Sequence, residues 1–180
     1  MITNHQPRRH RDTARRVFLC VSVTLWFVIA TIAASAQVSS GFNGTWILNQ
    51  DRSIFEPLTT RPDHRLVTLA VKGSELTHDT ETKRTRFIDV EPFQEVSTLK
   101  VSYTAKFDGN EYPVPNNAIA RVRLKRVGAL TFERAATAGS ANETSTWTVS
   151  RDGKTLTVVT KGVDALGMSY SSTQVFDKQP

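Results

Sequence analysis

Histidine and cysteine, two side chains that often carry catalysis near neutral pH, are scarce in this 180-residue chain. The one cysteine is Cys20, and beyond residue 36 the histidines are His64 and His78. His78 alternates with Leu76 and Thr80, which leaves two interpretations: an inward-facing base or ligand, or a hydrogen-bonded filler of a sheet interior. The histidines and the scattered acidic residues lack the spacing of a metal site, so we predict neither a metal nor a cofactor.

Motifs for nucleophilic and phosphoryl-transfer chemistry are also missing from the sequence. No serine stands in a Gly-x-Ser-x-Gly turn, and no glycine-rich loop precedes a helical pattern. Because cysteine is absent after residue 36, a domain formed there has no disulfide, thiolate nucleophile or Cys-ligated zinc. We therefore predict a protein without catalytic residues, while an isomerase or hydrolase stays open because a fold does not determine function.

The formal net charge of +6 is concentrated near the N-terminus. Five of the 23 Lys and Arg residues and one of the 17 Asp and Glu residues lie in residues 1–36, which leaves 18 basic and 16 acidic side chains. Nucleic-acid binding normally needs a clustered basic face or a recognisable module, so we predict no nucleic-acid partner. Arg121, Arg123 and Lys125 form one basic stripe, which fits a solvated strand face or contact with anionic headgroups or polysaccharide.

Residues 1–36 have the pattern of an export signal. Five arginines precede an 18-residue apolar run from Val17 to Ala34, and Ala34-Ser35-Ala36 supplies small residues before Gln37. We predict a signal peptide of residues 1–36, cleaved after Ala36, and a periplasmic or secreted domain of residues 37–180. Because roughly 17 to 25 apolar residues can cross a bilayer, an uncleaved anchor is the alternative, with this segment as the membrane contact and the domain outside the cytoplasm.

Residues 37–180 have the pattern of one all-β domain, with short β-branched runs between turn signals at intervals of roughly 8 to 12 residues. The clearest strand is 97–107, where apolar side chains occupy every second position from Leu99 to Phe107. Further strands are expected at 44–49, 65–72, 75–81, 84–91, 119–126, 129–136, 142–150, 154–161 and 168–177.

Short connections between these strands predict an antiparallel meander. Asp108-Gly109-Asn110 and Asp152-Gly153 predict two hairpins, since both tolerate the positive φ of tight turns. Closure into an up-and-down barrel of 8–10 strands would remove both sheet edges, and an open sandwich is the alternative. The segment 50–64, with two prolines, is expected to be a helical turn and loop covering one end.

Several segments resemble a known family. Phe42-Asn43-Gly44-Thr45-Trp46 with Ser53-Ile54-Phe55 resembles the opening of the calycins, the lipocalins and fatty-acid-binding proteins, and 173–178 resembles the last strand of fatty-acid-binding proteins. Residues 103–109 and 150–157 are similar to exported bacterial lipocalin-like proteins. The resemblance implies a barrel whose floor Trp46 closes, with Gly44 in a structural role. It also shows a departure, because Gln174-Val175-Phe176 stands where fatty-acid-binding proteins carry an Arg-x-Tyr pair for the ligand carboxylate.

The resemblance and the strand patterns together select candidate ligand-binding residues. Arg134 is the candidate cation for a carboxylate because it shares a strand face with Phe132, although an Arg at a strand end also commonly extends to water. The other candidates alternate on strand faces and would line a cavity or form plain core: Tyr103, Phe107, Phe132, Trp147, Tyr170, Gln174 and Phe176.

Two functions follow from these patterns. The first is an exported binding protein for a small apolar or amphipathic ligand held inside the barrel. The second is a structural or interaction module of the cell envelope, with the barrel filled by its own side chains. The sequence does not indicate an oligomeric state.

Overall fold

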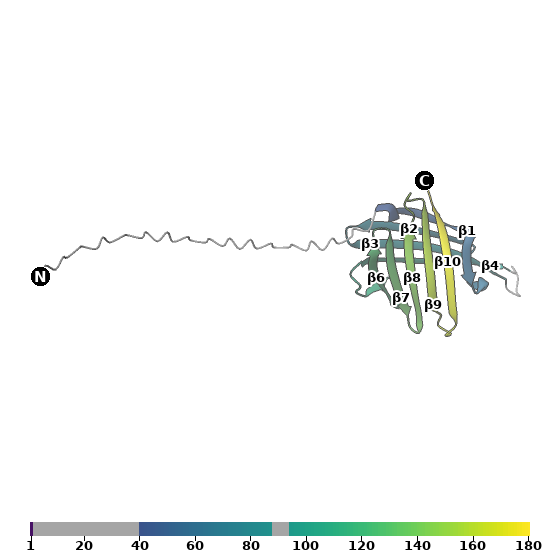
Figure 1. The fold of residues 1–180 in the computed structure, drawn as a ribbon. Coiled ribbons are helices and arrows are strands. Elements are labelled where there is room, and N and C mark those ends of the chain that lie inside the picture. The colour runs from purple at the N-terminus through teal and green to yellow at the C-terminus, as the bar shows by residue number, and fades with distance from the viewer. Residues whose placement is uncertain (2–39, 88–93) are drawn as a thin grey trace. The chain divides into compact units, whose positions relative to one another are not determined.

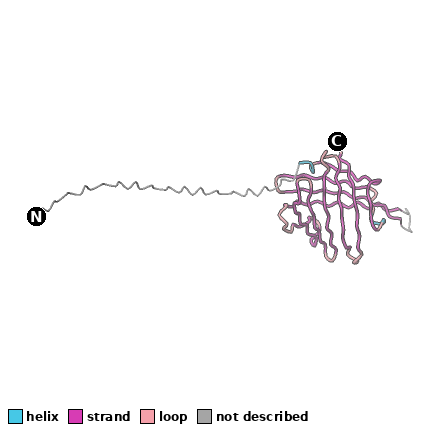
Figure 2. Tube along the Cα trace, viewed as in Figure 1, coloured by secondary structure: helices cyan, strands magenta, loops and turns pink. Residues whose placement is uncertain are grey.

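The computed structural model describes Met1, residues 40–87 and residues 94–180; the predicted cleavage site and the rest of the predicted signal peptide lie outside the described residues. Strands make up most of the described chain (Figures 1 and 2). In chain order the elements are η1 (Ser40–Phe42), β1 (Gly44–Glu56), η2 (Leu58–Thr60), β2 (His64–Lys72), β3 (Glu75–Phe87), β4 (Gln94–Lys106), β5 (Tyr112–Val114), β6 (Asn117–Gly128), β7 (Thr131–Ala138), β8 (Ala141–Val149), β9 (Thr155–Val163) and β10 (Ser169–Lys178). No helix among the described residues is long and apolar enough to cross a membrane.

The strands form one antiparallel sheet in the order β4-β3-β2-β1-β10-β9-β8-β7-β6-β5. Pairing of the first and last strands, β1 with β10, lets the sheet curl around one interior, and in Figure 1 strands β6 to β10 cross in front of β1 to β4. The edge strand β4 lies next to β5 and β6, but no ladder joins these edges within the described residues. The predicted all-β, up-and-down barrel is confirmed, with an open seam between β4 and β5–β6.

Two strand predictions were wrong because the apolar pattern changes while the backbone ladder continues. The predicted strand 75–81 and residues 84–87 of the predicted strand 84–91 belong to one strand, β3, whose pairing with β4 runs unbroken from Glu75 to Phe87. Residues 88–91 lie outside the described residues. The charged residues Lys83 and Arg84 interrupt the alternation, although their backbone stays in the ladder. The three-residue strand β5 was missed because it is too short for a periodic pattern and contains Pro113.

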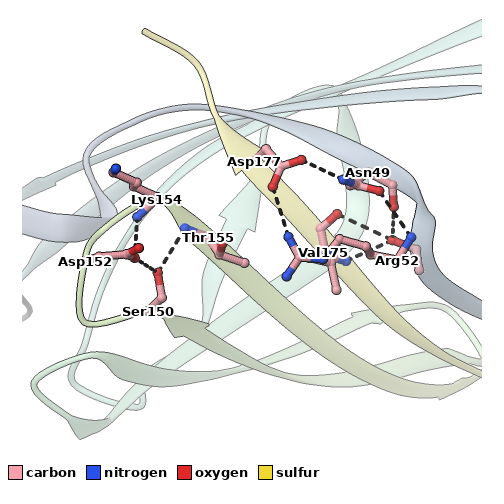
Figure 3. A network of polar contacts seen from close by, with 9 residues as sticks. Asn49, Arg52, Ser150, Asp152, Lys154, Thr155, Val175 and Asp177 are labelled. Carbon is pink, nitrogen blue, oxygen red and sulfur yellow. Dashed lines mark hydrogen bonds and ion pairs between the residues drawn. The ribbon is translucent and has the colours of Figure 1, made fainter.

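Of the two predicted hairpins, one forms and one does not. Strands β8 and β9 pair around Asp152-Gly153, and the Ser150 hydroxyl and the Asp152 carboxylate accept backbone N–H groups within that turn (Figure 3). The predicted hairpin at Asp108-Gly109-Asn110 was wrong, because β4 does not pair with β5. Instead, Asp108 bridges to Lys125 and the chain crosses to the other sheet edge. Turn residues set a local bend and leave the partner strand undetermined.

A bulge in β1 explains why the predicted strand 44–49 was too short. Four residues, 50–53, separate Asn49, opposite Val175, from Ile54, opposite Thr173. The Ser53 hydroxyl fills the gap in the ladder by accepting the Val175 N–H at 2.9 Å, and the Asn49 amide donates to the Asp177 carboxylate at 2.7 Å (Figure 3). The bulge shifts the inward face of the strand from Trp46 and Leu48 to Phe55. The strand continues beyond the bulge, so residues 50–56 of the predicted loop 50–64 belong to β1.

Apolar side chains fill one half of the barrel. We call this half the closed end; it includes the turns at 73–74, 107–111, 129–130 and 150–154, and the opposite half with the turns at 57–63, 115–116, 139–140 and 164–168 is the open end. The Trp46 indole N–H donates to the Phe42 carbonyl at 3.0 Å, and Gly44, with φ +132°, admits the Lys178 side chain. The following side chains have no exposed surface: Phe42, Trp46, Leu76, Leu124, Phe132 and Leu156.

Candidate functional site

Three adjoining cavities occupy the half of the barrel towards the open end. An inner cavity of about 220 Å³ lies above the packed core, a mouth cavity of about 520 Å³ reaches the open end, and a seam cavity of about 420 Å³ lies between β4 and β6. Glu143 lines all three cavities. The barrel is therefore filled at one end and hollow at the other, which combines the two alternatives that the sequence left open.

Arg65 is the cation of the inner cavity that lacks an acidic partner. It stands on β2 opposite Thr82, and its guanidinium donates to the Gln174 side-chain oxygen at 2.6 Å and to the Thr82 hydroxyl at 3.1 Å. Burial and repulsion by Arg84 lower the pKa of Arg65 to about 10, so it is charged at pH 7. No carboxylate among the described residues lies within ion-pair distance of it.

The second interior cation, Arg134, is paired. Its guanidinium donates to Glu143 Oε1 at 2.6 Å, and the Tyr170 hydroxyl donates to Glu143 Oε2 at 2.8 Å. Burial opposes ionisation of Glu143, but Arg134 and the hydrogen bond from Tyr170 outweigh it and hold the pKa of Glu143 below its usual range. Both oxygens of the Glu143 carboxylate are therefore occupied. The lining of the inner cavity carries two guanidinium groups, of Arg65 and Arg134, against this one carboxylate.

Gly162 permits the contact between Tyr170 and Glu143. It lies on β9, opposite Glu143 on β8 and opposite Tyr170 on β10. The Tyr170 ring passes over this glycine to reach Glu143, and a Cβ at Gly162 would lie 2.6 Å from the ring and 2.7 Å from the Asn142 carbonyl oxygen. Glycine in a strand commonly marks such a close approach.

We expect Gly162→Ala to lower the free energy of unfolding by about 1–3 kcal/mol, the range typical of overpacking. The added methyl group meets backbone as well as the Tyr170 ring, so the strands must shift. Urea denaturation measures the loss. The matched control is Gly128→Ala, where a Cβ meets nothing within 4 Å. Equal midpoints for the two variants would contradict the packing argument.

An aromatic and imidazole stack forms the floor of the inner cavity. His78 on β3 stacks on the Tyr103 ring on β4 at 4.6 Å, and the Trp147 ring meets His78 edge-on at 5.5 Å. Burial, together with repulsion by Arg134, lowers the pKa of His78 to about 3, so its ring is neutral at pH 7. Within residues 40–87 and 94–180, no three His, Cys, Asp or Glu side chains are grouped so as to hold a metal ion.

The structure brings most of the sequence-predicted ligand residues to these cavities. Arg134, Trp147, Gln174 and Phe176 line the inner cavity, and Tyr103 and Tyr170 line the seam cavity. Phe107 and Phe132 lie elsewhere: their rings are 5.4 Å apart within the packed closed end, and Phe132 also stacks on Trp147. Trp46 and Gly44 lie at the closed end, and the role of Trp46 as the barrel floor stays a prediction.

Sequence reasoning missed Arg65 and Glu143. A signal for both was present: Arg65 shares an inward strand face with Val67 and Leu69, and Glu143 shares one with Trp147. A charged residue in an otherwise buried stripe indicates an interior site, because burying an unpaired charge costs free energy.

Comparison with solved structures places this barrel in a known fold. It is similar to the Schistosoma mansoni fatty acid binding protein in complex with arachidonic acid, with a TM-score of 0.52 and 15% sequence identity over 79% of this chain and 99% of that chain. The domain has the calycin fold. No protein-family model and no curated protein matches the sequence.

Two further solved structures are similar to this chain with lower scores. A variant of the fluorescent protein UnaG aligns with a TM-score of 0.46 and 12% identity over 77% of this chain and 96% of that chain. The zebrafish ileal bile acid-binding protein complexed with cholic acid aligns with a TM-score of 0.41 and 14% identity over 78% of this chain and all of that chain.

Proposed function

We propose that this protein binds a small amphipathic anion inside the barrel, with the anionic head at Arg65. The observation that carries the proposal is the Arg65 guanidinium, which faces the inner and mouth cavities and has only neutral hydrogen-bond partners. A charge withdrawn from water is stabilised by an opposite charge. A carboxylate on the ligand would supply it, and a guanidinium binds carboxylates with two parallel hydrogen bonds.

The sequence departure in the last strand fits this arrangement. Gln174 occupies the place of the missing arginine, and its side chain holds Arg65, which comes from β2, at 2.6 Å. Arg134 is the weaker candidate for the head group because Glu143 already neutralises it. The cation for the ligand therefore comes from β2, which β1 alone separates from β10 in the sheet.

The walls of the cavities suit the apolar part of such a ligand. The seam and mouth cavities, of about 420 and 520 Å³, lie within the range of about 300–1,000 Å³ that is typical of small-ligand pockets, and the smaller inner cavity of about 220 Å³ adjoins them. The apolar lining of the inner cavity consists of Val67, Leu99, Val101, Trp147, Val158 and Phe176. Arachidonic acid in the Schistosoma protein has the same two parts, a carboxylate and an apolar chain.

We expect Arg65→Gln to weaken the binding of oleic acid by about 10–100-fold, which corresponds to the loss of one or two hydrogen bonds to a charged group. The affinity for oleyl alcohol, which has the same chain without the charge, should change by less than about twofold. Isothermal titration of both compounds measures the difference. The matched control is Arg151→Gln, an exposed arginine in the turn at the closed end. Equal loss for the acid and the alcohol, or binding of neither by the unaltered protein, would overturn the proposal.

We also infer that the domain acts outside the cytoplasm, on the basis of the signal pattern in residues 1–36. Expression of the full chain in a bacterial host with fractionation tests this. A periplasmic protein with the mass of a chain that starts at Gln37 supports cleavage. A full-length membrane protein that is accessible to added protease supports the anchor. A full-length protein in the cytoplasm would overturn export.

A further inference from the structure

Several buried polar atoms have no hydrogen-bond partner among the described residues, and three of them belong to the contact cluster at the inner and seam cavities: His78 Nδ1, Tyr103 Oη and Arg134 Nε. His78 and Tyr103 expose only 4% and 2% of their surface. Buried polar groups are nearly always hydrogen-bonded, and an unpaired one costs about 1–3 kcal/mol. Three together at one place therefore indicate a missing partner.

The three atoms belong to residues that surround the junction of two cavities. His78 lines the inner cavity, Tyr103 lines the seam cavity, and Arg134 lines both. Nearby polar groups are satisfied locally: the Trp147 indole N–H donates to the Ser145 hydroxyl at 2.8 Å. Other unpaired buried atoms, on His64, Arg84 and Arg126, belong to residues that do not line either of these two cavities.

The chemistry of these groups selects the kind of partner. The ring of His78 is neutral, and because His78 Nε2 contacts the Thr80 hydroxyl at 3.0 Å, Nδ1 is left to donate or to accept. Burial raises the pKa of Tyr103, so its hydroxyl is neutral and both donates and accepts. Arg134 Nε only donates. A hydroxyl group both donates and accepts, so it matches this set, whereas an alkyl chain satisfies none of it.

Stacking of the His78 ring on the Tyr103 ring holds these polar groups in place. His78 and Tyr103 are directly opposite each other on β3 and β4, and the Arg134 guanidinium carbon lies 6.0 Å from the Tyr103 ring centre. We propose that the His78–Tyr103–Arg134 subsite binds a hydroxyl group on the apolar part of the ligand. The inference rests on the proposed function and narrows it: the ligand is a hydroxylated amphipathic acid, with its carboxylate at Arg65 and a hydroxyl group at this subsite.

The test compares octadecanoic acid with its 3-hydroxy, 10-hydroxy and 12-hydroxy derivatives by isothermal titration. We expect at least one hydroxy acid to bind the unaltered protein about fivefold or more tightly than octadecanoic acid, the value of about one hydrogen bond. Tyr103→Phe should abolish that preference and change the affinity for octadecanoic acid by less than about twofold. His78→Leu should reduce the same preference. Tyr112→Phe, which removes a hydroxyl bonded to Asp108 at the closed end, is the control and should keep it.

The outcomes separate the two proposals. Equal binding of all four acids to the unaltered protein, or a preference that survives Tyr103→Phe, overturns the hydroxyl subsite while Arg65 keeps its role. Binding of none of the acids overturns the proposed function and the subsite together.

Discussion

Trp46→Ala is expected to lower the free energy of unfolding by about 3–5 kcal/mol, as large aromatic truncations in cores do. The Trp46 side chain has no exposed surface, its indole N–H is bonded to the Phe42 carbonyl, and the Lys178 ammonium lies 5.0 Å from its ring centre. Truncation would leave a cavity at the closed end and an unpaired carbonyl. Urea denaturation monitored by circular dichroism measures the change.

Two further variants make this prediction decisive. Ile54→Ala, on the same strand with its side chain 63% exposed, should change the free energy of unfolding by less than about 0.5 kcal/mol. If Trp46→Ala does not fold, Trp46→Phe keeps a ring and loses the indole N–H, with an expected cost of about 1 kcal/mol or more. A midpoint for Trp46→Ala equal to that of Ile54→Ala would refute the placement of Trp46.

Glu143→Gln is expected to lower the free energy of unfolding by about 2–4 kcal/mol. The substitution keeps the shape of the side chain but leaves the Arg134 charge without its counter-charge, and breaking a buried pair typically costs about 3–5 kcal/mol. The expectation is set lower because the two side chains retain 18% and 26% exposure. Tyr170 also loses its charged acceptor.

The cost of Glu143→Gln should depend on pH. The pKa of Glu143 is lowered from 4.5 in the folded protein, so the ionised carboxylate stabilises the fold above about pH 4.5. That contribution is lost as the pH falls through the folded-state pKa. The difference in unfolding free energy between the unaltered protein and Glu143→Gln should therefore be largest near neutral pH and shrink in acid.

An exposed ion pair provides the control for Glu143→Gln. Glu111 pairs with Arg123 at the surface, with 48% and 57% exposure, so Glu111→Gln should cost less than about 1 kcal/mol. A cost for Glu143→Gln as small as this, or one that does not change between neutral and acidic pH, would show that water enters the interior and screens the pair.

The strands and their antiparallel order could be predicted from the sequence where one face of a strand is buried. Alternation from Leu99 to Phe107 and the glycine turn at 152–153 report on local geometry, and local geometry is enough for a meander. The bulge of β1 and the crossing from β4 to β5 were not accessible. The first depends on hydrogen bonds between Asn49 and Asp177, 128 positions apart, and the second on which distant strand Asp108 meets.

The candidate site was accessible only in part. Aromatic residues such as Trp147 and Phe176 were identified because alternation shows that they face inward, but alternation does not distinguish the packed end of a barrel from the hollow one. Phe132 and Trp147 are paired neighbours, yet one belongs to the core and the other to a cavity wall. The role of Arg65 depends on its bond to Gln174, which lies 109 positions away in the sequence and on the far side of β1 in the sheet.

The seam between β4 and β5–β6 has a mechanical consequence. Elsewhere in the barrel, separating two strands would break ladder hydrogen bonds at about 0.5–1.5 kcal/mol each, whereas widening the seam breaks none among the described residues. The bridge from Asp108 to Lys125 and the bond from the Gly109 N–H to the Leu124 carbonyl fasten the seam at the closed end. Separation of the two edges at the open end would therefore cost no ladder hydrogen bond, whereas separation at the closed end would break the contacts of Asp108 and Gly109.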